Sequence, residues 1–380
     1  MELLINFFDD KQKPEYLYSG FFGIIFKIVI SSTIQLSMKN VDYIIVGDGY
    51  AAFFFAHQLI INKKSFVMFS ADMKGASQVS AGIVNPLVLK KFTTFWLAAE
   101  QIDFLTKTIS EIESYTGQKY LIEEKIHRIF HDEMEKNLWS MKTETDELKP
   151  FLNPDFETLE TIINPFGTGE VNHSARVDVN GFFSGISAYL EQHEMFVREK
   201  FDYNIIEGFS YKDFNFKNIV FCEGMGVRVN PFFTDIQVIA NKGHHLKVKL
   251  SEKMKHQYTL KKKHFLFPLN DEMHYYGGTY DPNERENEID DFKTEELKEG
   301  LSAFYPHDFE VVEVNYGFRP TVKDRRPILG NLPEHQNYYI FNGLGARGIL
   351  NGCYFSKELY EHIENGKELM KEVDLKRFNK

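Results

Sequence analysis

Cysteine is scarce in this sequence, and no pattern of metal ligands is present. The 380 residues contain only Cys222 and Cys353, which are too few for a disulfide framework, and neither belongs to a CxxC pair of the kind that binds zinc. The 13 histidines form no HExxH motif, so we expect no metal site. Reduced thiols of this kind are typical of a cytoplasmic protein.

Positive charge and long apolar runs are also scarce. The chain has 44 Lys and Arg against 55 Asp and Glu, a formal net charge of −11, and an acidic protein repels nucleic acid at long range. The apolar run over 21–30 is interrupted by Lys27 and is shorter than the ~20 residues that span a membrane. Two aspartates precede it and no small-residue cleavage site follows, unlike in a secretory signal. We interpret residues 1–37 as an extension outside the fold, with a weak membrane anchor as the alternative.

The composition does provide a core large enough for two domains, or for one domain with an inserted lobe, because 43% of the residues are hydrophobic and 26% are charged. Residues 41–46 form a β-branched apolar run that predicts a buried parallel strand. A glycine turn follows, then an apolar helix over 51–61 and a second strand over 65–69. Together these pieces span about 30 residues, the size of one βαβ unit.

The glycine turn between the first strand and the helix predicts a dinucleotide site. Gly47 permits a tight turn, Gly49 lets a diphosphate approach the backbone, and Ala52 is small enough for the helix to pack closely on the strand. The anion is expected at the N-terminus of the helix. The second strand departs from the pattern, because Ser70 stands where an acid normally accepts hydrogen bonds from ribose, and Asp72 is the alternative acceptor.

Glycine turns recur along the rest of the chain. One lies in the small-residue loop over 75–86, one follows a strand at Gly224, and the last, over 343–348, precedes a helix. Because nucleotide-type elements occur at both ends with an antiparallel region between them, we predict interleaved domains. The other predicted elements are an amphipathic helix over 92–112, a helix over 181–192, an antiparallel sheet over 238–279 and a helix over 281–300.

Six segments of the sequence resemble the D-amino-acid oxidase-like family of FAD enzymes, which includes glycine oxidase and sarcosine oxidase. They are YIIVGDGYAA, GASQVSAGIVNP, IVFCEGMG, YGGTY, GFRPTVKDRRPILG and FNGLGARGIL, in this order. The resemblance implies FAD as the cofactor and an α/β fold, in which a Rossmann-like FAD-binding domain is interleaved with an α+β substrate domain that has an antiparallel sheet. We assign residues 38–90, 165–230 and 317–380 to the FAD domain, and residues 91–164 and 231–316 to the substrate domain.

The resemblance also implies site residues. Arg319, in GFRP, is expected to bind a substrate carboxylate through its two-pronged guanidinium, with a surface position as the alternative. Arg347 is expected near the flavin or the substrate, with a salt bridge at the helix start as the alternative. Tyr276 is a candidate for the substrate wall, with a core position as the alternative, and the last glycine turn is expected to hold the pyrimidine edge of the flavin. The predicted cofactor contacts are Gly47, Gly49, Ala52, Ser70, Ala81, Gly82, Gly224, Gly343, Gly345, Ala346, Gly348 and Ile349.

The implied activity is oxidation of the C–N bond of a small amino acid or secondary amine that carries a carboxylate. A hydride passes to the flavin, and molecular oxygen or another acceptor takes up the electrons. Two alternatives stay open. The GLGARG turn also resembles the oxidase domain of the enzyme that matures 5-methylaminomethyl-2-thiouridine in tRNA, whose substrate is a carboxymethylamine on uridine, although the acidic charge balance disfavours tRNA. A flavin-binding protein without turnover is the second alternative.

Overall fold

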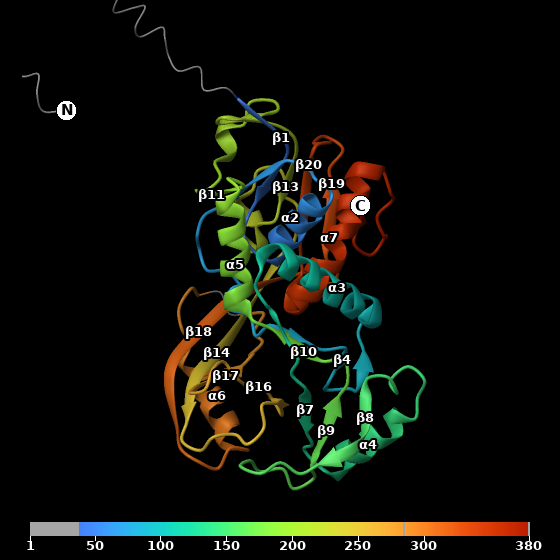
Figure 1. Cartoon of the computed structure of the whole chain (residues 1–380), viewed down its shortest axis with the longest axis vertical. Helices are drawn as coiled ribbons and strands as arrows, with labels where there is room; N and C mark the ends of the chain where they lie inside the picture. The colour runs from blue at the N-terminus through green and yellow to red at the C-terminus, as the bar shows by residue number, and fades with distance from the viewer. Residues whose placement is uncertain (1–37, 284–285, 379–380) are drawn as a thin grey trace, which may run out of the picture.

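The upper lobe of the molecule is built on one twisted sheet (Figure 1). The computed structural model describes residues 38–283 and 286–378, and the predicted extension over 1–37 lies outside them. The strand order is β11-β2-β1-β13-β20-β19, with β12 also paired to β13. The first five strands in this order are parallel to one another, whereas β12 is antiparallel to β13 and β19 is antiparallel to β20. The strands are β1 (Lys39–Val46), β2 (Phe66–Ser70), β11 (Phe196–Arg198), β12 (Ser210–Tyr211), β13 (Phe214–Phe221), β19 (Ile328–Asn331) and β20 (Tyr338–Asn342).

Four helices surround this sheet because its strands are buried on both faces, as parallel strands usually are. Every residue from Tyr50 to Leu59 in α2 is buried, so this helix needs cover on several sides. One cover is α7, which packs on α2, and α3 in turn packs on α7. A single hydrophobic cluster joins these helices to β1 and β2. The helices are α2 (Tyr50–Ile61), α3 (Ala98–Thr116), α5 (Val179–Gln192) and α7 (Gly348–Asn365).

The lower lobe contains a second, mainly antiparallel sheet (Figure 1). Its strand order is β18-β14-β17-β16-β15-β7-β9-β8. Helix α6 (Asp291–Ser302) covers one face, where Leu246 and Leu297 belong to one hydrophobic cluster. The strands are β7 (Ile126–Ile129), β8 (Leu152–Glu157), β9 (Thr168–Val171), β14 (Ile239–Leu250), β15 (Thr259–Lys261), β16 (Phe265–Pro268), β17 (Met273–Gly277) and β18 (Phe309–Thr321).

Short elements connect the two lobes. A small sheet, β3-β10-β6, and the pair of β4 with β5 lie between them in the chain (Figure 1). The remaining elements are β3 (Ile83–Val84), β4 (Leu87–Val88), β5 (Thr93–Thr94), β6 (Leu121–Ile122), β10 (Ala175–Val177), α4 (Glu133–Thr143), η1 (Tyr203–Ile205), η2 (Gly224–Val229), η3 (Gly345–Arg347) and η4 (Leu375–Phe378).

Two predicted helices begin later than the sequence pattern indicates. The helix predicted over 92–112 begins only at Ala98, because Phe92 and Leu97 both adopt left-handed backbone angles, with φ of 46° and 57°. The helix predicted over 281–300 begins at Asp291, because the Asp290 side chain caps it by accepting a hydrogen bond from the backbone N–H of Lys293.

The predicted α/β fold, with a parallel sheet and an antiparallel sheet assembled from interleaved segments, is confirmed. The predicted domain boundaries differ from the sheets in two places. Strand β9 lies in the antiparallel sheet although residues 165–230 were assigned to the FAD domain. Helix α3, assigned to the substrate domain, packs against α7 of the upper lobe. Within residues 38–283 and 286–378, no helix combines the length and apolar character needed to cross a membrane.

Candidate functional site

The turn after β1 has the backbone that an anion site requires. Gly47 has a φ of 116°, and a Cβ atom there would lie 2.5 Å from the carbonyl oxygen of Cys222, so only glycine fits. Gly49 precedes α2 and offers no side chain to cap it. The first helical N–H, that of Tyr50, donates to Ser77 Oγ at 3.2 Å. The positive end of α2 is therefore open to an anionic ligand, and Ala52 is fully buried behind it.

The first and last glycine turns meet in space although about 300 residues separate them in sequence. A Cβ atom at Gly348 would lie 3.1 Å from Cδ2 of Tyr50, and one at Gly352 would lie 3.2 Å from Cβ of Tyr50. Helix α7 begins at Gly348 without a side-chain cap, as α2 does at its own start. The structure thus places two open helix N-termini side by side.

The middle glycine turn joins the same region. Asn342 Nδ2 donates to the carbonyl oxygen of Gly224 at 2.8 Å, and the N–H of Gly343 donates to Asn342 Oδ1 at 2.7 Å. Ala346 is exposed and Ile349 is buried. Three turns predicted independently, after β1, β13 and β20, are therefore held together by the upper sheet.

Ala81 and Gly82 lie in the small-residue loop, where the need for glycine has a local cause. A Cβ atom on Gly82 would lie 2.2 Å from the carbonyl oxygen of Val177, and the Val177 N–H donates to the Gly82 carbonyl at 2.8 Å. Gly82 is therefore required by the close approach of β10, independently of any ligand. Ala81, beside it, is partly exposed.

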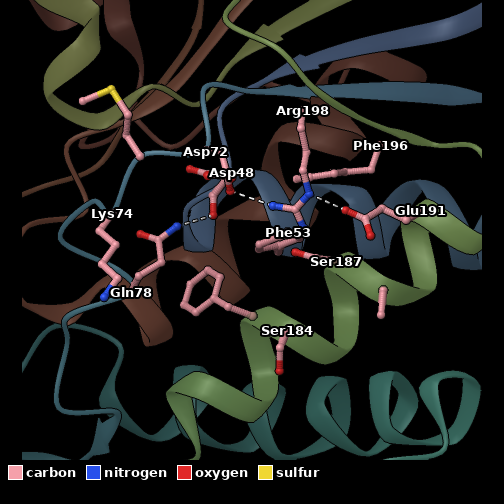
Figure 2. A pocket seen from close by; sticks show the side chains of 13 residues that line it. Asp48, Phe53, Asp72, Lys74, Gln78, Ser184, Ser187, Glu191, Phe196 and Arg198 are labelled. Carbon is pink, nitrogen blue, oxygen red and sulfur yellow. Dashed lines mark hydrogen bonds and ion pairs between the residues drawn. The ribbon is translucent and has the colours of Figure 1, made fainter.

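Ser70, at the end of β2, is connected to an acid that sequence reasoning missed. Ser70 Oγ donates to Asp48 Oδ2 at 2.7 Å, and burial raises the pKa of the Asp48 carboxyl. Asp48 lines a cavity of about 380 Å³ together with Asp72 and Arg198. Figure 2 shows Arg198 between Asp72 and Glu191, and both ion pairs measure 2.6 Å. The sequence signal that could have identified Asp48 is its position inside the glycine turn, between Gly47 and Gly49.

Arg319, on β18, is a half-buried cation held by two hydrogen bonds. Its Nη1 donates to the carbonyl oxygen of Thr279 at 3.0 Å and to Asn241 Oδ1 at 3.3 Å. A Cβ atom at Gly243 would lie 2.3 Å from Nη2, so glycine makes room for the guanidinium. Burial lowers the pKa of Arg319, and no carboxylate within residues 38–283 and 286–378 forms an ion pair with it. A half-buried guanidinium in this state favours an anionic ligand.

A stack of rings extends from Arg319 along the same face of the antiparallel sheet. His245 stacks on Tyr275 with ring centroids 4.4 Å apart, and Phe267 stacks on the other side of Tyr275 at 4.6 Å. Arg176 lies 4.5 Å above Phe267. Burial, with the charges of Lys247 and Arg319, lowers the pKa of His245 to about 3, and burial raises the pKa of Tyr275 to about 12. Both rings are therefore neutral near pH 7.

Tyr276 is a core residue, and its prediction as part of the substrate wall is wrong. It is fully buried in the hydrophobic cluster that contains Leu297 and Phe304. Its hydroxyl lies against α6, since a Cβ atom at Gly300 would lie 2.9 Å from it. Side chains alternate along a strand, so Tyr275 faces Arg319 and Tyr276 faces α6. The sequence placed the tyrosine on the correct strand but on the wrong face.

Arg347 lies at the start of α7 within a cationic group. Its guanidinium is 4.4 Å from the ring of Phe95, and that of Arg326 is 4.2 Å from the ring of Trp96. Burial, together with the charges of Arg325 and Arg326, lowers the pKa of Arg347. None of the three arginines forms an ion pair with an acid in the described part of the chain. The salt bridge considered for Arg347 is thus absent there.

Comparisons with known proteins agree with this arrangement. The family model for FAD-dependent oxidoreductases of the DAO type matches residues 42–362. The fold is similar to that of glycine oxidase from Geobacillus kaustophilus, with a TM-score of 0.71, 18% identity, and coverage of 90% of this chain and 98% of that one. It is also similar to iminodiacetate oxidase from Chelativorans sp. BNC1 (TM-score 0.70, 16% identity, coverage 88% and 98%). L-proline dehydrogenase from P. horikoshii matches at a TM-score of 0.67, 11% identity, and coverage of 90% and 97%.

Proposed function

We propose, on the premise that the chain belongs to the DAO family of FAD-dependent oxidoreductases, that it oxidises the C–N bond of a small amino acid or secondary amine that carries a carboxylate. FAD, when bound, supplies the acceptor for a hydride. Loss of that hydride from the carbon next to nitrogen would leave an iminium cation, which would release its N–H proton to give an imine, and water would hydrolyse this product. The electrons then pass to molecular oxygen or to another acceptor.

The residues present fit FAD. Gly49 brings no side chain of its own to the turn, and the positive N-terminus of α2 suits the diphosphate, with the Ser77 hydroxyl beside it. The second open N-terminus, at Gly348, lies against Tyr50 of α2, within the reach of one extended dinucleotide. Its partial positive charge suits the pyrimidine edge, where negative charge collects on reduction.

One observation supports the substrate class above all others: Arg319 has no carboxylate partner among the described residues. Thr279 and Asn241 hold one edge of its guanidinium, and a carboxylate that accepts two hydrogen bonds would satisfy the remaining N–H groups. Partial burial of this cation makes an anionic partner favourable. The neutral rings of Tyr275 and His245 provide a wall beside it that carries no competing charge. A small amine anchored by its carboxylate fits these surroundings.

Anaerobic reduction of the bound flavin tests this proposal. We expect glycine, sarcosine, proline or a D-amino acid to bleach the flavin absorbance, and the matching amines without a carboxylate (methylamine, dimethylamine and pyrrolidine) to leave it unchanged. Arg319→Met should abolish bleaching by the active substrate. Tyr276→Phe, on the opposite face of the same sheet, is the matched control and should bleach at the normal rate.

Two outcomes would contradict the proposal. Equal bleaching with and without the carboxylate would remove the role of Arg319. A flat response to the whole panel would favour a flavin-binding protein without turnover, or a larger substrate.

The second candidate substrate is carboxymethylaminomethyl-uridine in tRNA. It carries the same carboxymethylamine, so Arg319 would serve it equally well. The observation in its favour is the group of Arg325, Arg326 and Arg347, which lacks an acidic partner among the described residues although the chain carries a net charge of −11. Binding of tRNA that weakens steeply with added salt would support this candidate. No binding at low salt would eliminate it.

A further inference from the structure

The cavity beside β2 lies where the sugar of a dinucleotide is expected. In the general βαβ pattern an acid near the end of the second strand accepts hydrogen bonds from the ribose hydroxyls. Here that position is Ser70, which is almost fully buried. A serine hydroxyl is neutral and has one proton to donate, so by itself it cannot replace a carboxylate. The cavity of about 380 Å³ is nevertheless lined by three acidic residues, Asp48, Asp72 and Glu191. Two of them, Asp48 and Asp72, are hydrogen-bonded to Ser70.

Asp72 is the less suitable of the two. Its carboxylate is ion-paired with Arg198, whose guanidinium also binds Glu191, and the Asp72 side chain is 65% exposed. Its backbone has a φ of 53°, and its N–H donates to Ser70 Oγ. Figure 2 shows the ion pair of Asp72 with Arg198 at the wall of the cavity. Asp72 is thus committed to a surface network.

Asp48 has the opposite properties. It forms no ion pair with any described residue, and it is mostly buried, which raises the pKa of its carboxyl. The Ser70 hydroxyl donates to one carboxylate oxygen of Asp48 at 2.7 Å, and Gln78 Nε2 donates to the main-chain carbonyl oxygen of Asp48 at 3.0 Å. These two contacts hold the carboxylate over the end of β2. The turn that approaches the diphosphate therefore also places an acceptor beside the sugar.

We infer that Asp48, positioned by Ser70, binds the ribose hydroxyls of the adenosine half of FAD. The acid comes from within the glycine turn, and the serine at the strand end orients it. The inference relies on FAD being the cofactor and not on the identity of the amine substrate, so its test is independent of turnover.

The test measures the dissociation constant of flavin from the full-length apoprotein by quenching of flavin fluorescence. Two ligands are compared: FAD, and an FAD analogue whose adenosine carries 2′,3′-dideoxyribose. Because hydrogen bonds to charged groups contribute about 1.5–3 kcal/mol, Asp48→Ala should weaken FAD about 10- to 100-fold. The same variant should change the affinity for the dideoxy analogue by less than about 3-fold, because the hydroxyls are already missing.

Three further variants sharpen the result. Asp72→Ala is the matched control at the same cavity and should leave both affinities within about 3-fold. Asp48→Asn keeps the side-chain shape and one acceptor oxygen, so FAD should weaken less, about 3- to 10-fold. Adding Ser70→Glu to Asp48→Ala restores an acid at the strand end and should recover most of the affinity for FAD. Thermal unfolding confirms that each variant is folded.

Two results would overturn the inference. In the first, Asp48→Ala and Asp48→Asn weaken FAD and the dideoxy analogue equally, or weaken neither. In the second, the loss that depends on the hydroxyls appears with Asp72→Ala. If no amine of the panel bleaches the flavin but Asp48→Ala shows the expected loss of affinity for FAD, the ribose site stands and only the proposed substrate class is contradicted.

Discussion

Replacing Gly243 by alanine should displace Arg319 without removing its charge. A Cβ atom at this position would lie 2.3 to 2.6 Å from three guanidinium atoms, whereas carbon needs about 3.5 Å of separation. The guanidinium must therefore move by about 1 Å, and a displacement of that size costs up to about 100-fold when geometry matters. We expect kcat/KM for a carboxylated amine to fall about 30- to 100-fold, mainly through a higher KM, because the carboxylate contact exists before and during the reaction.

Anaerobic stopped-flow reduction of the flavin separates these effects. The dissociation constant of the substrate should rise while the limiting rate of reduction changes little. The fold should remain, since the atoms in the way belong to the end of a flexible side chain, and thermal unfolding checks this point. Lys249→Ala, near the exposed end of the same strand, is the control. Normal substrate affinity in a folded Gly243→Ala protein would refute the assignment of Arg319 as the carboxylate site.

Three other predictions follow from the same geometry. Gly47→Ala introduces a Cβ atom 2.5 Å from the Cys222 carbonyl at a positive φ, so it should lower the free energy of unfolding by about 2–4 kcal/mol in urea titrations; a wild-type value would contradict the strain argument. Tyr276→Phe removes a buried hydroxyl that has no hydrogen-bond partner among the described residues, and should stabilise the protein by up to about 1 kcal/mol with unchanged flavin reduction; slower reduction would return this residue to the active site. Apart from His57, which is paired with Glu111, burial holds the pKa of four histidines near 3 or 4, below the ordinary 6.5. The unfolded chain therefore binds protons that the folded chain does not. The contribution of these histidines to the free energy of unfolding is complete above about pH 6.5 and falls as the pH drops toward 4, by about 1 kcal/mol for each histidine one pH unit below 6.5. Urea titrations above pH 6.5 and one unit below it that gave equal free energies of unfolding would contradict this prediction. These histidines are His127, His245, His264 and His274.

The first βαβ unit could be predicted from sequence because every level of the pattern agrees there. The apolar run before Gly47 predicts a buried strand, and β1 is that strand, paired on both sides. The uniformly apolar helix that follows predicts cover on several sides, and α2 has it. The start of the helix predicted over 92–112 was missed because the backbone angles of Phe92 and Leu97 are set by tertiary packing, which no periodicity records.

The site residues likewise divide into those that a sequence motif identifies and those that only the tertiary structure reveals. Arg319 was identified through its GFRP motif, and the structure finds it half-buried, without an acidic partner among the described residues. His245 and Tyr275 were missed because their importance lies in which face of the sheet they share, and a shift of one residue along a strand reverses that face. Asp48 was missed because the general pattern looks for the acid at the end of β2, whereas the Ser70 hydrogen bond links it to the preceding turn.

The order in which the upper sheet is joined has a consequence for biosynthesis. Val41 of β1 pairs with Phe216 of β13, and Ile219 of β13 pairs with Tyr338 of β20. Strand β1 therefore waits with an unsatisfied edge while the intervening chain is translated, and the glycine turns that follow β1 and β20 meet only when β20 and α7 arrive. Such delayed, non-local pairing is slow and exposes unpaired strand edges that are prone to aggregation. Nascent chains of this protein should consequently depend on chaperones, and should capture FAD only near the completion of synthesis.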